Sequence, residues 1–508
     1  MSITGPGSIT AASVTAQTNM MNQLNTLSEE LGTGQAAQTY SGLASQAGLA
    51  LQLNAQLAAT NGYSNTATDV GTTLTLAQSV LTQLGSAGSA VGQSIEQQDD
   101  FTLDNNGQTS TQEAAASQLD QILSLLNTQV GSNYIFSGSS TTQPSVASTS
   151  DILNGNGAQA GLTQVIANRL QADEGSDSPP LGRLVIPPVT GSTVSIGDDV
   201  AGSPFGFKLA GVNSSLTGAT VTGPSGSPSS ISVDLASNPN AGDSIAFNLT
   251  LPDGSSQTVT LQATTASPPG ANQFTIGANA TATATNMQTA LTSAVSNLAQ
   301  TALPAASTMA AADNFFNADP PQVVDAGSPP DYATATSLEN GTQANTVFWY
   351  TGENGSTPAL QTATAQVGPS TTIAYGMRAN EQAISTLVAN VAVLAATTYS
   401  ASNPNAEASY QALSQSVQAN LAGTSGTQSI SDIEANLANA QTTVSNATTL
   451  NTQTQTTLQD MLQNIDGVSQ NQIGEQILTL QNTLSASMSI TARLAQLSLV
   501  NYLAPSSG

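Results

Sequence analysis

The side chains best able to do chemistry in this sequence are carboxylates that stand next to each other. Three such pairs are Glu29-Glu30, Asp99-Asp100 and Asp198-Asp199. A paired carboxylate can act as a general acid or base, or hold a metal ion, when burial or a nearby charge shifts its pKa. No pattern around these pairs indicates burial, and adjacent side chains on a helix diverge. We therefore interpret all three as solvated surface pairs.

Three other stretches bear on ligand binding. Asp104-Asn105-Asn106-Gly107 partly resembles the start of a calcium loop, but it lacks the later carboxylates and the closing Glu, which favours a plain turn. The glycine-rich residues 203–211 lack the spacing that cradles a phosphate, which favours a turn beside a strand. Trp349, between Phe348 and Tyr350, could bind a sugar, but a buried aromatic cluster is the better interpretation.

The composition excludes several kinds of catalysis. The sequence contains no cysteine and no histidine. Thiolate nucleophiles, Ser-His-Asp triads, imidazole zinc sites and disulfides are therefore all ruled out. The sequence predicts no catalytic residues, no cofactor and no metal site, and hence a protein that is not an enzyme.

The charge balance excludes further partners. Acidic residues number 31 and basic residues 5, for a formal net charge of -26. The cations are Arg169, Arg183, Lys208, Arg378 and Arg493. Five scattered cations cannot neutralise a track of phosphates, so we expect no binding to nucleic acid or to an anionic membrane surface. No apolar run is long enough for membrane insertion, and the first residues lack a secretory signal pattern.

Two terminal regions carry the spacing of long helices that pack side by side. Apolar or small residues recur in steps of four and three, which is a heptad seam. In the first region they are Met20, Leu24, Leu27, Leu31, and then Val70, Leu74, Ala77, Leu81, Leu84, Gly88, Val91 and Ile95. In the last region they are Ile430, Ile433, Leu437, Ala440, Val444 and Ala447, and then Ile473, Ile477, Leu480, Leu484 and Leu494. Residues 380–396 and 406–421 predict two further helices.

The middle of the chain, roughly residues 140–375, has a different pattern. Short alternating runs such as residues 230–235, 245–251 and 258–261 lie between Gly, Ser and Pro turns, and Pro252-Asp253-Gly254 predicts a hairpin. Residues 285–299 predict one embedded helix. We therefore expect a mainly antiparallel β module.

Together these patterns predict an α+β protein. A long coiled-coil-like helical rod is formed by both chain ends, and the β module is inserted between them. The expected segments are residues 1–40, an assembly helix; 41–139, a helical rod; 140–375, β-rich outer domains; 376–469, a second helical rod; and 470–508, a second assembly helix.

Both ends of the sequence resemble bacterial flagellins. The C-terminal helix pattern of residues 478–487 leads into Leu497-Ser498-Leu499-Val500-Asn501-Tyr502-Leu503, which is typical of flagellin C-termini. Near the start, residues 23–27 and then Leu31-Gly32-Thr33-Gly34-Gln35 are similar to the family's helix and glycine break. The chain departs from the family at Gln35, where a basic residue is usual, and at residues 39–44, which replace an Asp-Asp-Pro turn.

Within the family, other stretches favour the branch of hook-filament junction proteins. Tyr134-Ile135-Phe136-Ser137-Gly138 resembles a stretch of that branch, whereas filament flagellins more often have a Phe-Asn-Gly turn. Residues 347–353 and 373–379 resemble the return of its outer domain into the helical core.

The resemblance implies a secreted, extracellular structural subunit of the flagellum, exported by the type III apparatus. Its expected partners are itself, hook-associated protein, flagellin and an export chaperone. The expected subunit contacts are Met20, Leu24, Leu27, Leu31, Leu480, Leu484, Leu494, Leu497, Leu499, Tyr502 and Leu503. We expect these ends to be largely disordered in the monomer and to order on assembly, because isolated helices with a narrow apolar stripe are marginal in water. Two alternatives stay open: a filament flagellin, and a secreted adhesin whose β module binds a ligand.

Overall fold

A computed structural model of the chain describes residues 6–97, 101–423 and 426–503. Its helices and antiparallel sheets confirm the prediction of an α+β protein. The chain divides into two compact units. Within the described residues, unit 1 comprises 6–71, 365–373 and 442–503, and unit 2 comprises 72–364 and 374–441. The expected five segments, and one continuous rod built from both chain ends, stay predictions.

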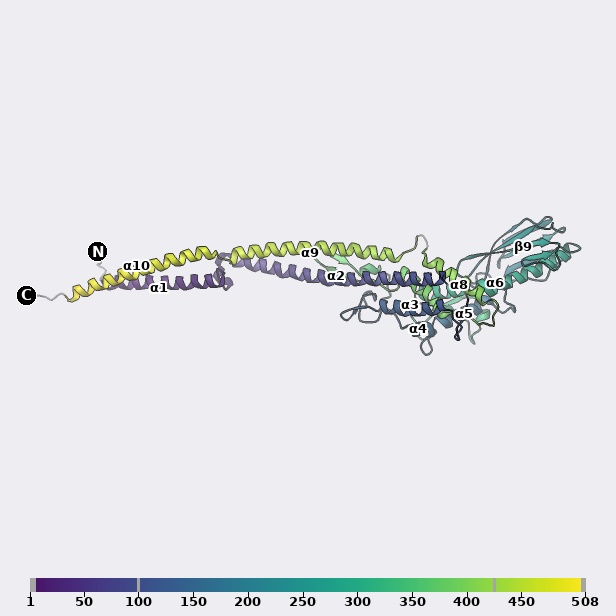
Figure 1. Cartoon of the computed structure of the whole chain (residues 1–508), viewed down its shortest axis with the longest axis horizontal. Coiled ribbons are helices and arrows are strands. Elements are labelled where there is room, and N and C mark those ends of the chain that lie inside the picture. Colours follow the sequence, from purple (N-terminus) through teal and green to yellow (C-terminus); the bar gives the residue numbers. More distant parts are fainter. Residues whose placement is uncertain (1–5, 98–100, 424–425, 504–508) are drawn as a thin grey trace, which may run out of the picture. The chain divides into compact units, whose positions relative to one another are not determined.

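Unit 1 is helical. It contains α1 (Pro6–Thr33), the short 3-10 helix η1 (Tyr40–Gln46), the first part of α2 (Ala47–Glu96), the last part of α9 (Ile430–Asp466), and α10 (Gln470–Leu503). The purple α1 and the yellow α10 lie side by side (Figure 1). They run antiparallel, because Gln17 near the start of α1 bonds to Ser487 and Thr491 late in α10.

The same unit joins α2 to α9 through small and apolar residues. A Cβ placed on Gly71 of α2 would lie 3.5 Å from a methyl carbon of Val444 on α9. The Gln455 amide donates to the Ser64 hydroxyl at 2.8 Å. Val444 belongs to the heptad stripe predicted for α9, and Gly71 directly follows Val70 of the stripe predicted for α2, whereas Ser64 and Gln455 belong to neither stripe.

Unit 2 has a helical part built around an almost fully buried helix. Its helices are the rest of α2, α3 (Ser110–Leu126), α4 (Thr149–Asn154), α5 (Leu162–Glu174), α6 (Ala280–Phe316), η2 (Tyr332–Thr334), η3 (Ala359–Thr362), α7 (Gln382–Ala396), α8 (Ala406–Leu421) and the start of α9. Nearly every residue of α7 is buried, because α7 packs against α3, α6 and α8. Thr109 and Gln112 begin α3 with a reciprocal capping box.

The β module of unit 2 contains two four-stranded sheets with the orders β3-β4-β7-β6 and β10-β9-β8-β5. Their strands are β3 (Leu184–Val185), β4 (Thr193–Asp198), β5 (Lys208–Ser214), β6 (Ala219–Ser225), β7 (Ser230–Leu235), β8 (Ser244–Thr250), β9 (Ser256–Thr264) and β10 (Gln273–Thr275). The pairings are antiparallel except for β10 with β9, which is parallel. Small two-stranded sheets are formed by β1 (Gln129–Val130) with β2 (Asn133–Tyr134), β11 (Gln322–Val324) with β12 (Leu338–Asn340), and β13 (Thr364–Gln366) with β14 (Thr372–Ala374).

The core of the β module lies between its sheets and α6. Met287, Leu291 and Val295 recur every four residues on α6 and are completely buried. They pack in one cluster with inward side chains of the strands, such as Ile231 and Phe247. The apolar residues of β8 alternate with half-buried ones, as expected for a strand with one face on a core.

Most of the individual elements that the sequence predicts are confirmed. The observed bounds of α8 and β7 are those predicted, and Pro252-Asp253-Gly254 joins β8 to β9 in an antiparallel hairpin. The embedded helix is longer than predicted, since α6 continues through Pro304 to Phe316. Proline removes one backbone donor and normally breaks a helix. Here the alanine-rich residues 305–312 that follow Pro304 are buried, and this packing holds the helix together.

Candidate assembly surface and polar clusters

The predicted assembly residues on α1 and α10 lie where the two helices meet, but the seam is shallow. Met20, Leu24 and Leu27 on α1, and Leu480 and Leu484 on α10, are only half-buried. Polar groups share the seam, since the Gln17 amide donates to Thr491 Oγ1 at 3.0 Å. Two helices alone therefore leave much of this apolar surface in water.

The remaining predicted assembly residues are not buried by the helix pair. Leu31 is 36% exposed and Leu494 is 40% exposed, so the heptad seam does not include them in this structure. The side chains of Leu497, Leu499, Tyr502 and Leu503 lie outside the described residues, although their backbone continues α10. Leu31 and Leu494 are therefore free to contact another molecule.

Large apolar side chains at the surface are concentrated in unit 1. Among the described residues, its exposed ones are Val14, Met21, Leu31, Leu49, Leu51, Leu450, Met461, Leu478, Met488, Ile490 and Leu494. Unit 2, although much larger, exposes only Val185 and Val200 over the same described part of the chain. Exposed apolar side chains gathered in one region mark an interaction surface more often than scattered ones do.

A β-bridge joins the end of α1 to the break between α9 and α10. Gln35 pairs with Gly467, the Ala36 N–H donates to the Asp466 carbonyl at 2.7 Å, and the Val468 N–H donates to the Gly34 carbonyl at 3.2 Å. Gly34 has φ +72°, a left-handed conformation that suits the end of a helix. Helix α9 ends at Asp466, directly before Gly467. Gln35 takes part through its backbone, so the bridge needs no basic side chain.

The three stretches that favour the junction branch meet in one place in unit 2. The Gly138 N–H donates to the Met377 carbonyl, and the Ala379 N–H donates to the Phe136 carbonyl. The Glu353 N–H donates to the Ser137 carbonyl at 2.9 Å. Residues 134–138, 347–353 and 373–379, far apart in sequence, therefore form a single structural feature.

Two side chains tie this feature together. Glu353 accepts the Ser139 N–H at 2.9 Å, and backbone N–H groups of this kind hold the pKa of that carboxyl below its usual value. The buried Arg378 donates to the Gly355 carbonyl at 2.7 Å and to the Thr357 carbonyl. Gly138 has φ +62°, and a Cβ there would lie 2.8 Å from a Glu353 oxygen, so only glycine fits.

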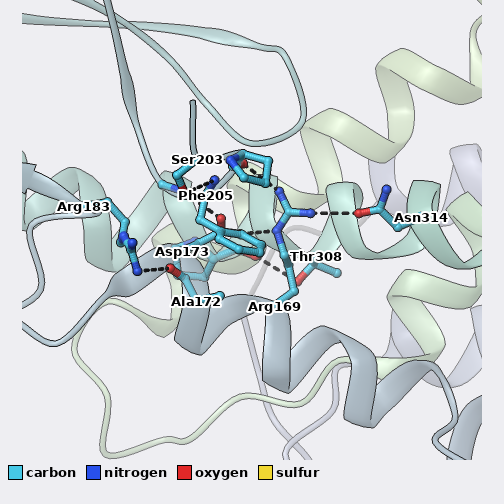
Figure 2. Close-up of polar contacts among 11 residues, drawn as sticks. Arg169, Ala172, Asp173, Arg183, Ser203, Phe205, Thr308 and Asn314 are labelled. Carbon is cyan, nitrogen blue, oxygen red and sulfur yellow. Dashed lines mark hydrogen bonds and ion pairs between the residues drawn. The ribbon is translucent and has the colours of Figure 1, made fainter. Parts of the chain in front are cut away.

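A second polar cluster surrounds Arg169 on α5 (Figure 2). The Arg169 Nε donates to Asp173 Oδ2 at 2.9 Å, one helical turn along, and Nη1 donates to Asn314 Oδ1 at 2.8 Å on α6. The guanidinium also stacks over Phe205 with 5.0 Å to the ring centroid. The Asp173 side chain is completely buried. Burial raises the pKa of Asp173, and the charge of Arg169 opposes this shift.

Arg183 extends the cluster to Asp199. The Arg183 Nε lies 2.6 Å from Asp199 Oδ2, and Nη1 donates to the Ala333 carbonyl at 2.7 Å. Asp198 is also half-buried, and burial raises the pKa of its carboxyl. The interpretation of Asp198-Asp199 as a solvated pair was therefore wrong, because both residues are half-buried, Asp199 pairs with Arg183, and Asp198 accepts the Leu209 N–H. Glu29 and Glu30 show no ion pair in the described residues, whereas Asp99-Asp100 lies outside those residues.

The cations are therefore distributed very unevenly. Arg169, Arg183 and Arg378 are buried in unit 2, and the half-buried Lys208 has its pKa lowered by desolvation. Arg493 on α10 is exposed and has no ion pair in the described part of the chain. Three of the five cations thus bond to carbonyls or carboxylates within unit 2, Lys208 Nζ is buried there without a hydrogen-bond partner, and Arg493 faces solvent.

The aromatic stretch at Trp349 belongs to the core. Trp349 is 3% exposed, its indole N–H donates to the Phe316 carbonyl at 3.0 Å, and its ring packs edge-on against Phe316 at 5.3 Å between centroids. This confirms the buried cluster and leaves no indole face for a sugar. A shallow pocket of about 310 Å³ lies beside it.

Asp104 forms the expected turn, in which its carboxylate accepts the Asn106 and Gln108 N–H groups.

The comparisons with known proteins identify no family. The chain matches no protein-family model, and no curated protein matches it. The resemblance to flagellins therefore rests on the residues quoted above. Over the described residues, no helix is both long and apolar enough to cross a bilayer, and no three metal-binding side chains gather at one point.

The Arg169 cluster is the feature that the sequence did not predict. Arg169 and Asp173 stand four residues apart, a spacing that pairs charges on a helix. In a chain with five cations, this spacing was the signal in the sequence that could have predicted the ion pair between Arg169 and Asp173. The partners Asn314 and Asp199, however, come from other parts of the chain and could not be assigned from spacing.

Proposed function

We propose that this chain is an extracellular structural subunit of the bacterial flagellum, without enzymatic activity, that occupies the junction between hook and filament. The observation that carries the proposal is the concentration of exposed apolar side chains on the paired terminal helices of unit 1. A surface of this kind is buried when subunits assemble, and burial of apolar area is the main favourable term in association.

The shallow seam between α1 and α10 supports assembly through more than two helices. A tube of identical subunits needs heterologous contacts, in which each copy presents one surface and accepts another. Half-buried Leu24 and Leu484 fill one face of the pair, and Met21 and Ile490 are exposed away from it. In the proposed function the two chain ends form a coiled-coil-like rod that packs into the wall of such a tube.

The position at the junction is supported by one structural feature. The stretches around Phe136, Trp349 and Met377 resemble junction proteins, and they are bonded to one another. Residues that carry one resemblance and also form one site support a shared role, here the return of the outer domain into the helical part. The proposed partners are further copies of the chain, hook-associated protein and flagellin, with an export chaperone before secretion.

The location of the protein on the flagellum tests the proposal. Immunogold labelling with an antibody against the β module should mark one short band where hook meets filament. A strain lacking the gene should keep its hook and release flagellin into the medium. Label along the whole filament would contradict the junction and favour the filament flagellin instead.

The filament flagellin is the second candidate because unit 2 carries a large β module with two sheets. Such outer domains are also found on filament flagellins. The amount of protein separates the two candidates, since a flagellin dominates the protein of sheared flagella whereas a junction protein is scarce. Gel quantification of sheared flagella measures this ratio directly.

A further inference from the structure

The helix pair α1–α10 has its charges separated toward opposite ends. The carboxylates of these two helices are Glu29, Glu30 and Glu475, and their one cation is Arg493. Leu27 and Glu475 line the same groove, so the carboxylates of both helices lie at one level, near the bridge at Gln35. Arg493 lies 18 residues further along α10 than Glu475, which at about 1.5 Å per residue is about 27 Å.

Arg493 has no means of reaching these carboxylates within its own chain. It is exposed and has no ion pair in the described residues. At about 27 Å the attraction to Glu475 is screened, because the Debye length is about 10 Å at 0.1 M salt. When the helix pair is covered by neighbours, an unpaired guanidinium would be desolvated at a large cost. The neighbour that covers Arg493 must therefore supply a carboxylate.

We infer that Arg493 of one copy binds the carboxylate group Glu29, Glu30 and Glu475 of a second copy that is displaced by about 27 Å along the helix pair. This inference rests on the proposed self-assembly. The contact is heterologous and points the same way in every copy, so it defines the direction and the stagger of stacking. The apolar surface alone does not define the stagger, because its residues occur along the whole helix pair.

Charge exchange in the full-length chain tests the contact. Arg493→Glu should reduce incorporation into flagella at least about 10-fold, because like charges then face each other. Adding Glu29→Arg, Glu30→Arg and Glu475→Arg to the same chain should restore incorporation to within about 2-fold of the wild type. Circular dichroism and the Trp349 fluorescence of each purified variant verify that it is folded. Normal incorporation of Arg493→Glu, or a failure of the exchanged chain to recover, would overturn the inference.

Cysteine crosslinking tests the stagger, because the natural sequence has no cysteine. A disulfide needs Cα atoms within about 7 Å, so cysteines at positions 493 and 29 cannot pair within one chain. The doubly substituted chain Arg493→Cys, Glu29→Cys should therefore form dimers and longer ladders under mild oxidation. The matched control is Arg493→Cys with Asn22→Cys, an exposed position on α1 about 10 Å away along the helix. Equal crosslinking of test and control, or none in either, would contradict the stagger.

Salt gives an independent readout. The Arg493→Glu variant replaces attraction by repulsion, so its association should recover in part at 1 M salt, where the Debye length is about 3 Å. Association of the wild-type chain should not weaken steeply, since salt also relieves the repulsion between acidic subunits. A steep loss of wild-type association with salt would contradict the expectation that relief of the acidic repulsion offsets the weakened ion pair.

The two proposals can fail separately. If the protein is found on flagella but neither charge exchange nor crosslinking behaves as described, the inference is wrong and the proposed function stands. If it is absent from flagella but the purified chain crosslinks between positions 493 and 29, the contact is real and the proposed function is wrong.

Discussion

Unit 1 and unit 2 differ in whether their few cations and their large apolar side chains are buried or exposed. In unit 2 three arginines are buried against carbonyls and carboxylates, Lys208 is half-buried, and large apolar side chains are almost all inside. In unit 1 the one cation is exposed, and so are eleven large apolar side chains of the described residues. Unit 2 thus keeps almost all of its large apolar side chains and its cations inside, whereas unit 1 leaves many of its large apolar side chains and its cation at the surface. Under the proposed function, this difference separates an outer domain from an assembly element.

Removing part of the terminal helix gives the largest expected effect. Deletion of residues 485–508 should abolish incorporation into flagella, because it removes more than half of α10. Unit 2 should stay folded, and its single Trp349 should report an unchanged unfolding transition in urea. Normal incorporation of the truncated chain would show that assembly does not depend on α10.

Breaking the buried ion pair should destabilise unit 2 strongly. Arg169→Met leaves the Asp173 carboxylate buried without its partner, which should lower the free energy of unfolding by about 3–5 kcal/mol. The matched change Arg493→Met should alter it by less than about 0.5 kcal/mol, because Arg493 is exposed. Urea unfolding monitored by Trp349 fluorescence measures both, and equal effects would remove the distinction between the units.

Leucine truncation sharpens the same contrast. Leu291→Ala in the core of the β module should cost about 2–5 kcal/mol of stability. Leu478→Ala, at a side chain that is 61% exposed, should cost less than about 0.5 kcal/mol in the monomer but should reduce incorporation into flagella. A normal level of incorporation for Leu478→Ala would argue against an apolar assembly surface on α10.

Limited proteolysis compares the chain ends with the rest. If the terminal helices are ordered chiefly by assembly, a protease should trim both ends of the monomer quickly and leave a core of roughly residues 40–465. Assembled flagella should protect the same ends. Ends that resist protease in the monomer as well as unit 2 does would contradict ordering on assembly.

A pH dependence from Glu381 is the smallest expected effect. Burial raises the pKa of Glu381 above its ordinary value of 4.5, although hydrogen bonds from Arg378 and Gln428 oppose the shift. The folded state then binds more protons than the unfolded state, so this contribution to stability is complete below about pH 4.5 and is lost as the pH rises through the raised value. Glu381→Gln should flatten that slope in denaturation curves taken across this range.

The sequence predicts those elements whose residue pattern repeats locally, and it does not predict contacts between residues far apart in the chain. The heptad steps at Val70 and Val444, and the alternation in β7, are repeated locally, so the elements they predict are found. The sequence predicts the embedded helix only over residues 285–299, whereas α6 spans Ala280–Phe316, because burial by distant residues keeps the helix intact through Pro304. Arg169 bonds to a residue 145 positions away, and no spacing rule identifies such a partner.

The bridge between Gln35 and Gly467 has a mechanical consequence. Helix α1 ends on one side of the bridge, and the break between α9 and α10 lies on the other side. Neither helical path therefore has a continuous ladder of helical hydrogen bonds across the bridge. Bending there involves backbone rotation beside glycines and the few hydrogen bonds of the bridge, whereas bending within α1 or α10 would stretch a continuous helical ladder. In the proposed assembly, bending is therefore expected at this bridge. The helices on either side of it stay stiff while the rotating, curved shaft transmits torque.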